Sequence, residues 1–229
     1  MKITWFGHSA FRLDIGNSVL LIDPFLTGNP VFEGSAEEAS AGATHVALTH
    51  GHDDHVGDAV DICKTNDATL IAIFEICMYL GVEKAEPTNT GGTIATDDFD
   101  VTFVRADHSS STIVDGNFVY LGNPCGLVIT PKDGPAVYHM GDTDIFGDMA
   151  LINELYQPEI GIVPMGDRFT MGARSAALAC KRFFDFKTII PCHYKTFPII
   201  APNADGFVSE LGEQGNRAAV LDVGGSIDV

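Results

Sequence analysis

Short runs of β-branched and aromatic residues recur along the chain and predict a scaffold rich in strands. Polar or glycine-containing segments separate these runs, and Gly16-Asn17 is suited to a tight turn between the second and the third. We therefore expect the chain to open with an antiparallel meander. The predicted strands are Ile3–Phe6, Phe11–Ile15, Ser18–Ile22, His45–Thr49, Thr69–Ile73, Val101–Val104, Phe118–Leu121, Gly126–Thr130, Ala136–His139, Ile160–Val163 and Thr188–Ile190.

Helical spacing of apolar residues appears in the later part of the pattern, between and after strands. The clearest case is Ala173–Phe184, with apolar residues at 176, 177, 179, 180 and 183. Strands first, followed by strands alternating with helices, predict sheets covered by helices in an α/β or α+β layered sandwich. The other predicted helices are His55–Thr65, Phe74–Leu80, Asp148–Tyr156 and Ala204–Glu213.

No internal repeat or low-complexity linker divides the 229 residues, a length that suits one substantial core. We expect one domain over residues 1–229. If it is built from two pseudo-symmetric halves, they should meet near the polar segment Ser109–Gly116.

Composition excludes several classes of protein. Hydrophobic residues make up 45% of the chain and charged residues 19%, a balance that excludes collagen, coiled-coil and disordered chains. The 31 Asp and Glu residues outnumber 13 Lys and Arg residues, and the net charge of -18 opposes binding to nucleic acid or an anionic membrane. We expect the partner to be a small molecule rather than nucleic acid or a membrane. The sequence leaves open whether the chain forms a homo-oligomer.

Cysteine usage and the apolar segments indicate the cytoplasm. The five cysteines form no C-x-x-C pair, so neither a disulfide framework nor a zinc ribbon is expected. The opening segment Met1–His8 lacks the apolar run of a secretory signal. The most apolar stretch, Thr69–Val82, is interrupted by Glu75 and is too short to span a membrane.

The strongest chemical signal is an H-x-H-x-D-H motif directly after the predicted strand His45–Thr49. It contains His50, His52, Asp54 and His55. Imidazole nitrogens and carboxylates are ligands for divalent metals, and a short loop can aim all four inward. The alternative is a solvated polar turn before a helix, with an aspartate as N-cap.

One loop cannot complete two coordination shells, so further ligands should follow other strands. His108, Asp142 and His193 each lie a few residues beyond a predicted strand. Loops that follow strands gather at an edge of a sheet and form sites there. Seven candidate ligands are too many for one tetrahedral ion.

The series His50-x-His52-x-Asp54-His55, then His108, then Gly141-Asp142-Thr143, then His193 resembles the metallo-β-lactamase superfamily. Longer segments resemble one branch of it, the metal-dependent hydrolases related to ascorbate-6-phosphate lactonase. The resemblance covers nearly the whole chain and implies a four-layered αββα sandwich of the α/β class. The segments that carry it are Trp5-Phe6-Gly7-His8-Ser9, Tyr138–Thr143, Phe169–Gly172 and His193–Pro198.

The resemblance also implies a ligand set. It assigns His50, His52 and His108 to one metal, Asp54, His55 and His193 to a second, and the bridging position to Asp142. We expect two divalent ions per chain, zinc first, with manganese and iron as alternatives. In such centres the ions lower the pKa of a shared water, and the metal-bound hydroxide attacks the substrate while Asp54 serves as the catalytic proton acceptor.

Other residues have two interpretations each. His8, after the first strand, either faces the substrate or supports a metal ligand, or makes a structural hydrogen bond. His139 is either a supporting or a buried, satisfied histidine rather than a ligand. Cys192 is expected to be a buried apolar residue rather than part of the site. Lys195 either places an ammonium near an anionic substrate group or is a solvated loop residue.

The leading hypothesis is a hydrolase that cleaves a small soluble ester, lactone or phosphodiester. The modest length and the acidic charge disfavour the alternative of a nuclease acting on RNA. A metal-stabilised binding or scaffold protein without catalysis is the third interpretation. No G-x-S-x-G or Walker motif supports a serine hydrolase or a nucleotide kinase.

Overall fold

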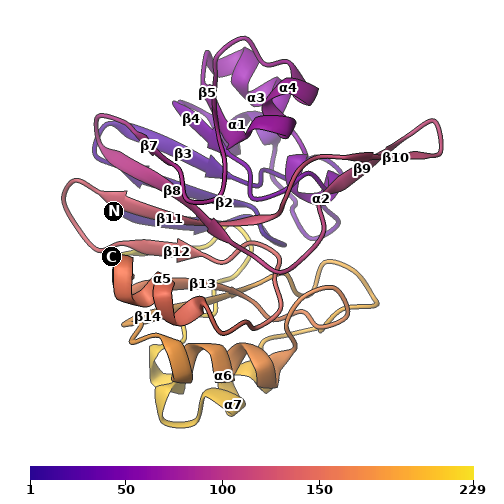
Figure 1. Cartoon of the computed structure of the whole chain (residues 1–229). Helices are drawn as coiled ribbons and strands as arrows, with labels where there is room; N and C mark the ends of the chain where they lie inside the picture. Colours follow the sequence, from indigo (N-terminus) through magenta and orange to yellow (C-terminus); the bar gives the residue numbers. More distant parts are fainter.

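Two β-sheets lie face to face in the computed structural model, which describes residues 1–229, and helices cover the outer face of each (Figure 1). The helices α1, α3 and α4 (Ala36–Ser40, Ala59–Asn66 and Phe74–Leu80) lie outside the first sheet. The helices α5, α6 and α7 (Met149–Tyr156, Ala173–Phe183 and Asp205–Leu211) lie outside the second. The predicted αββα layering is confirmed.

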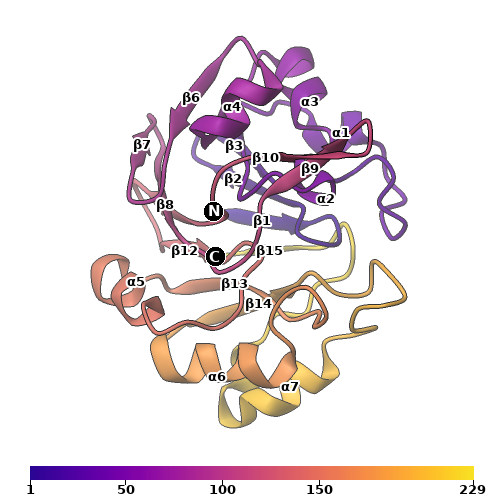
Figure 2. The same cartoon turned by 45° about the vertical axis from the view of Figure 1, so that its right-hand side comes forward.

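The first sheet has seven strands in the order β15-β1-β2-β3-β4-β5-β6. Its first three strands in the chain are antiparallel, which confirms the predicted meander, and β3 to β6 are parallel. The last strand of the chain pairs with the first, so the two termini lie side by side (Figure 2). The strands are β1 (Lys2–Trp5), β2 (Phe11–Ile15), β3 (Ser18–Ile22), β4 (His45–Ala47), β5 (Thr69–Ile73), β6 (Ala85–Thr88) and β15 (Ser226–Asp228).

The second sheet has six strands in the order β14-β13-β12-β11-β8-β7, with β12, β13 and β14 parallel. The chain passes from the first sheet to the second between β6 and β7, rather than at the expected segment 109–116. That segment instead begins a separate two-stranded hairpin, β9 (Ser111–Val114) and β10 (Asn117–Tyr120). The other strands are β7 (Thr93–Ala95), β8 (Phe99–Arg105), β11 (Cys125–Pro131), β12 (Val137–His139), β13 (Ile160–Pro164) and β14 (Thr188–Cys192).

The predicted helix over residues 55–65 was wrong in one respect, because it is two helices, α2 (Asp53–Val56) and α3. Gly57 separates them with φ of 41°, and a Cβ atom there would lie 2.5 Å from the Pro24 carbonyl oxygen. Only glycine fits this close approach. The predicted helix over 204–213 ends earlier, at Leu211, and continues as a 3-10 turn, Gly212–Arg217.

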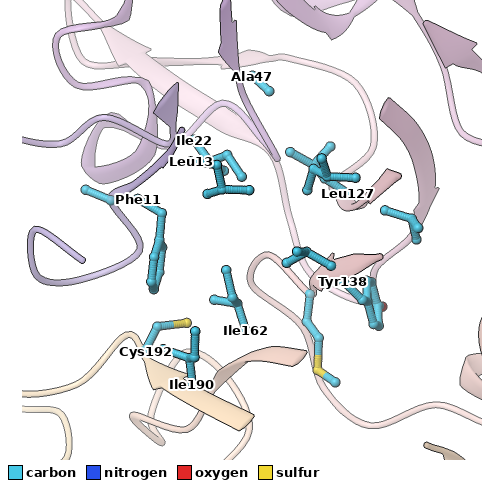
Figure 3. Packing of buried hydrophobic residues seen from close by; sticks show 14 of the residues in the cluster. Phe11, Leu13, Ile22, Ala47, Leu127, Tyr138, Ile162, Ile190 and Cys192 are labelled. Atoms are coloured by element: carbon cyan, nitrogen blue, oxygen red, sulfur yellow. The ribbon is translucent and has the colours of Figure 1, made fainter. Parts of the chain in front are cut away.

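One hydrophobic cluster of 59 buried residues joins both sheets. Figure 3 shows side chains of the first sheet, among them Phe11 and Ile22, facing Leu127, Ile162 and Ile190 of the second. This shared core fixes the two sheets relative to each other, and with them the loops that extend from their strand ends. None of the helices has the length and apolar character needed to cross a bilayer.

Candidate metal centre

All seven predicted ligands lie in segments that follow the carboxyl ends of strands, with Asp54 and His55 in the short helix α2. His50, His52, Asp54 and His55 follow β4, and His108 follows β8, whereas Asp142 and His193 follow β12 and β14. Because the two sheets are packed face to face, these loops meet at one edge of the sandwich. The structure thus brings together residues that are up to 143 positions apart, from His50 to His193.

The first cluster contains His50, His52 and His108, whose ligand atoms lie within 4.8 Å of one another. The Nε2 atom of His50 is 2.9 Å from Nδ1 of His52. Burial lowers the pKa of all three imidazoles, and the neighbouring His55 adds to this effect at His50 and His52. The rings are therefore neutral at pH 7, the form in which imidazole binds a metal.

The second cluster contains His8, Asp54, His55 and His193, again with ligand atoms within 4.8 Å. His8 and His193 both have left-handed backbones, with φ of 52° and 56°, and the His193 amide donates to the His8 carbonyl over 2.9 Å. Their rings lie 4.0 Å apart. Left-handed residues other than glycine each cost about 1 kcal/mol, and such strain is common at functional sites.

Asp142 lies between the two clusters and is almost fully buried, with 3% of its side chain exposed. Its Oδ2 atom is 3.0 Å from His193 Nε2 and 3.7 Å from His108 Nε2, while Oδ1 is 3.4 Å from His55 Nε2. Burial alone would raise the pKa of Asp142, but His193 and His55 hold it well below its usual range. The carboxylate is therefore ionised and faces histidines of both clusters.

Asp23, which sequence reasoning missed, orients two of the histidines. Its Oδ2 atom accepts hydrogen bonds from His55 Nδ1 at 2.7 Å and from the Thr49 hydroxyl at 2.6 Å. Because that hydroxyl gives its proton to Asp23, its oxygen accepts the Nδ1 proton of His50, 2.9 Å away. Asp23 and Thr49 thus hold the Nδ1 side of both rings, and Nε2 of each faces the other candidate ligands. The sequence feature that points to this role is an aspartate directly after the buried strand β3.

Three buried polar atoms among the candidate ligands support the binding of divalent cations. His55 Nε2, Asp142 Oδ1 and His193 Nδ1 are buried without a hydrogen-bond partner. An unpaired buried polar atom costs about 1–3 kcal/mol. Histidine and carboxylate donors of this kind suit zinc, manganese and iron alike, and each cluster brings its ligand atoms within 4.8 Å of one another.

The remaining residues singled out in the sequence, His139, Cys192 and Lys195, differ in how far they are buried. His139 is fully buried, accepts the Gly141 amide at Nδ1 and lies 3.4 Å from the Ser9 carbonyl at Nε2, so it holds the turn before Asp142. Cys192 is also fully buried, and burial raises the pKa of its thiol well above the usual value. Lys195 is exposed in the loop that follows His193.

Comparisons with known proteins identify the family of the chain. A family profile described as a beta-lactamase superfamily domain matches residues 2–193. A protein of Methylocella silvestris described as a UPF0173 metal-dependent hydrolase is 57% identical over 228 residues, which cover 98% of each chain.

Two solved structures are also similar. Igni18, a metallo hydrolase from the archaeon Ignicoccus hospitalis, has a TM-score of 0.87 at 33% identity and covers 99% of this chain and 97% of its own. An isothiocyanate hydrolase from Delia radicum gut bacteria has a TM-score of 0.77 at 19% identity, over 100% and 99% of the two chains, and shows a shared fold. The chain therefore belongs to the metallo-β-lactamase superfamily, in the UPF0173 family of metal-dependent hydrolases.

Proposed function

We propose that this hydrolase is dinuclear and cleaves a small ester, lactone or phosphodiester. The observation that carries the proposal is the Asp142 carboxylate, which faces histidines of both clusters. One ion would be held by His50, His52 and His108, and the second by Asp54, His55 and His193. Asp142 would contribute to both. A relation to ascorbate-6-phosphate lactonase within the superfamily remains a prediction from the sequence.

Divalent ions in such a centre supply Lewis acidity, which lowers the pKa of water and stabilises negative charge on a substrate oxygen. Asp54 is placed to move the proton, because 33% of its side chain is exposed whereas Asp142 is enclosed. Burial disfavours its charge, but the hydrogen bond from His8 and the nearby His55 hold the pKa of Asp54 below its usual range. The ionised carboxylate can accept a proton from the attacking water and return it to the leaving oxygen.

We also propose that the substrate carries an anionic group away from the bond that is cut. Lys195 and Arg168 are exposed, have left-handed backbones and form no ion pair. Their loops are joined, because the Ala201 amide donates to the Gly166 carbonyl and the Lys195 amide donates to the Ala201 carbonyl, each over 2.7 Å. Two unpaired cations on adjoining loops beside His193 offer a place for a carboxylate or phosphate.

The cysteines support a reducing compartment such as the cytoplasm. All five are free and buried, and burial raises the pKa of the Cys63 and Cys180 thiols to about 12. Thiols of this kind are inert apolar residues rather than reactive groups.

The test is metal counting followed by a substrate screen. Metal-depleted protein would be reloaded with zinc, manganese or iron and freed of excess ion, and we expect close to two ions per chain by elemental analysis. The loaded protein would then be assayed with p-nitrophenyl esters, lactones, bis(p-nitrophenyl) phosphate and single-stranded RNA. We expect turnover of at least one small substrate and its loss on chelation. One ion or none per chain, turnover of RNA alone, or metal binding without any turnover would contradict the proposal.

A further inference from the structure

The hairpin β9–β10 projects from the sandwich (Figures 1 and 2), and it carries exposed apolar side chains. Its turn residues Asp115 and Gly116 both have positive φ, 51° and 79°, as a two-residue hairpin turn of the primed type requires. Phe118 pairs with Ile113 and Tyr120 pairs with Ser111, so these side chains share one face. Ile113, Phe118 and Tyr120 are 58%, 78% and 66% exposed.

The opposite face and the base of the hairpin are fixed to the loop that carries the metal ligands. The Thr112 hydroxyl donates to Asp53 Oδ1 over 2.7 Å. At the base, the Ser110 hydroxyl accepts the Gly51 amide and donates to the Leu121 carbonyl, each over 3.0 Å. A Cβ atom on Gly51 would lie 2.5 Å from the Leu121 side chain. The hairpin therefore has a set position relative to the loop 50–55.

A cavity of about 460 Å³ lies along the apolar face of the hairpin, and His108 forms part of its wall. This volume is in the range of small-molecule pockets. Phe118, Tyr120 and Pro124 also line it, and Tyr120 donates its hydroxyl to Asn123 Oδ1 over 2.9 Å. No Asp, Glu, Lys or Arg side chain lines the cavity, although the net charge of the chain is -18. Apart from the ligand candidate His108, the rest of the lining is neutral and polar: Ser109, Ser110, Ser111, Gly122 and Asn123.

We propose that this cavity, named here the hairpin pocket, binds a neutral apolar or aromatic group of the substrate. The proposal rests on the proposed function, since His108 joins the pocket to the first metal cluster. A group seated against Phe118 and Tyr120 would remove their apolar surface from water, and aromatic contacts add to that gain. The scissile bond would then lie at the metal ligands. Lys195 and Arg168, the unpaired cations near His193, do not lie on the hairpin. The proposed substrate therefore has an apolar group at one end and an anionic group at the other.

The test measures binding separately from turnover. Zinc-loaded protein with ¹³C-labelled isoleucine methyl groups would be titrated with 4-phenylbutanamide and, for comparison, with acetamide. We expect the Ile113 methyl signal, identified by Ile113→Val, to shift in a saturable way with 4-phenylbutanamide alone. Phe118→Ala should weaken binding about tenfold or more. Leu155→Ala, which removes an equally exposed apolar side chain from α5, should leave it unchanged.

Two outcomes would overturn the hairpin pocket. One is that Phe118→Ala and the wild type respond in the same way to 4-phenylbutanamide, either with equal affinity or with no binding by both. The other is a dimer in analytical ultracentrifugation that Phe118→Ala converts to a monomer, which would make the apolar face an interface between copies. If 4-phenylbutanamide binds as expected but no ester, lactone or phosphodiester is turned over, the proposed function fails and the pocket stands.

Discussion

The Nε2 atom of His8 lies 3.1 Å from Oδ2 of Asp54, although the two residues are 46 positions apart. His8 is fully buried, and burial together with the neighbouring His193 lowers its pKa to about 4. The ring is therefore neutral at pH 7 and donates its Nε2 proton to the ionised Asp54. Its Nδ1 atom lies 3.0 Å from the hydroxyl of Thr196, which also donates to the Tyr194 carbonyl. His8 thus links the loop after β14 to the carboxylate proposed to move the proton.

We expect His8→Ala to lower the affinity for one of the two metals about 10- to 100-fold, as loss of a residue that orients a ligand does. Competition with a chromophoric chelator would measure this for each ion. His45→Ala is the control. His45 is half-buried, its ring is hydrogen-bonded to the Thr44 hydroxyl, and it lies far along the chain from His8. Unchanged affinity for both ions would assign His8 a structural role only.

Asp54→Asn and His52→Ala should each remove most activity, by about 100-fold or more, while the fold is kept. Neither side chain belongs to the shared core. Steady-state kinetics at saturating metal, with circular dichroism as the check on folding, would test this. Wild-type turnover by either variant would show that the ligand assignment is wrong.

Asp23→Asn should destabilise the metal-free protein by about 1–3 kcal/mol and weaken metal binding about 10-fold or more. The amide cannot accept all three hydrogen bonds that the buried carboxylate accepts from Thr49 and His55. Urea denaturation and metal titration provide the two measurements. Asp98→Asn is a matched control, since Asp98 also accepts a hydroxyl and a backbone amide, from Ser18 and Asn17. Equal metal affinity in both variants would exclude an orienting role for Asp23.

Lys195→Ala should raise KM two- to fivefold for an anionic substrate and leave kcat and a neutral analogue unchanged. The lost attraction is present in the ground state and the transition state alike, and an exposed pair contributes up to about 1 kcal/mol. Lys64→Ala removes another exposed, unpaired lysine, on α3, and serves as the comparison. The proposed contact fails if charged and neutral substrates respond equally.

His139 should make the metal-free protein less stable in acid. Burial lowers the pKa of this imidazole in the folded chain, so the unfolded chain, with a histidine pKa of about 6.5, binds more protons. The free energy of unfolding therefore falls as the pH drops below about 6.5 and levels off below the folded pKa, with no contribution from this residue well above 6.5. Urea denaturation between pH 4.5 and 8 measures how the free energy of unfolding changes with pH. In His139→Gln this pH dependence should be weaker than in the wild type, by an amount that corresponds to up to one bound proton. Identical slopes would contradict this.

Sequence reasoning located elements best where burial dominates. The bounds of β2, β3, β5 and α4 match the prediction. Most apolar residues of the three strands lie in the core, whereas α4 buries only Ile76 and Cys77. The strands β6, β7, β9 and β15 were missed. For example, β6 contains Glu86 and Pro87 and is defined by its pairing with β5, which the sequence does not display.

The functional site also divides into residues that the sequence can identify and residues that it cannot. Histidines and aspartates after strands can be recognised as ligands because few other roles need that combination. Asp23 could not be separated from an ordinary turn residue before Pro24, since its role depends on contacts with Thr49 and His55. The hairpin pocket was equally invisible, because Phe118 reads as a core strand residue until its exposure is known.

The distribution of ligands along the chain has a consequence for biosynthesis. The second cluster brings His8 and His193 together, and β1, which His8 follows, has its outer neighbour in β15. A chain that emerges from the ribosome in order has His8 and the H-x-H-x-D-H loop early but lacks the complete centre until His193 has been made. Metal can therefore bind at the complete centre only after β14 and His193 have been synthesised, and a translation product that ends before His193 would carry an incomplete set of ligands.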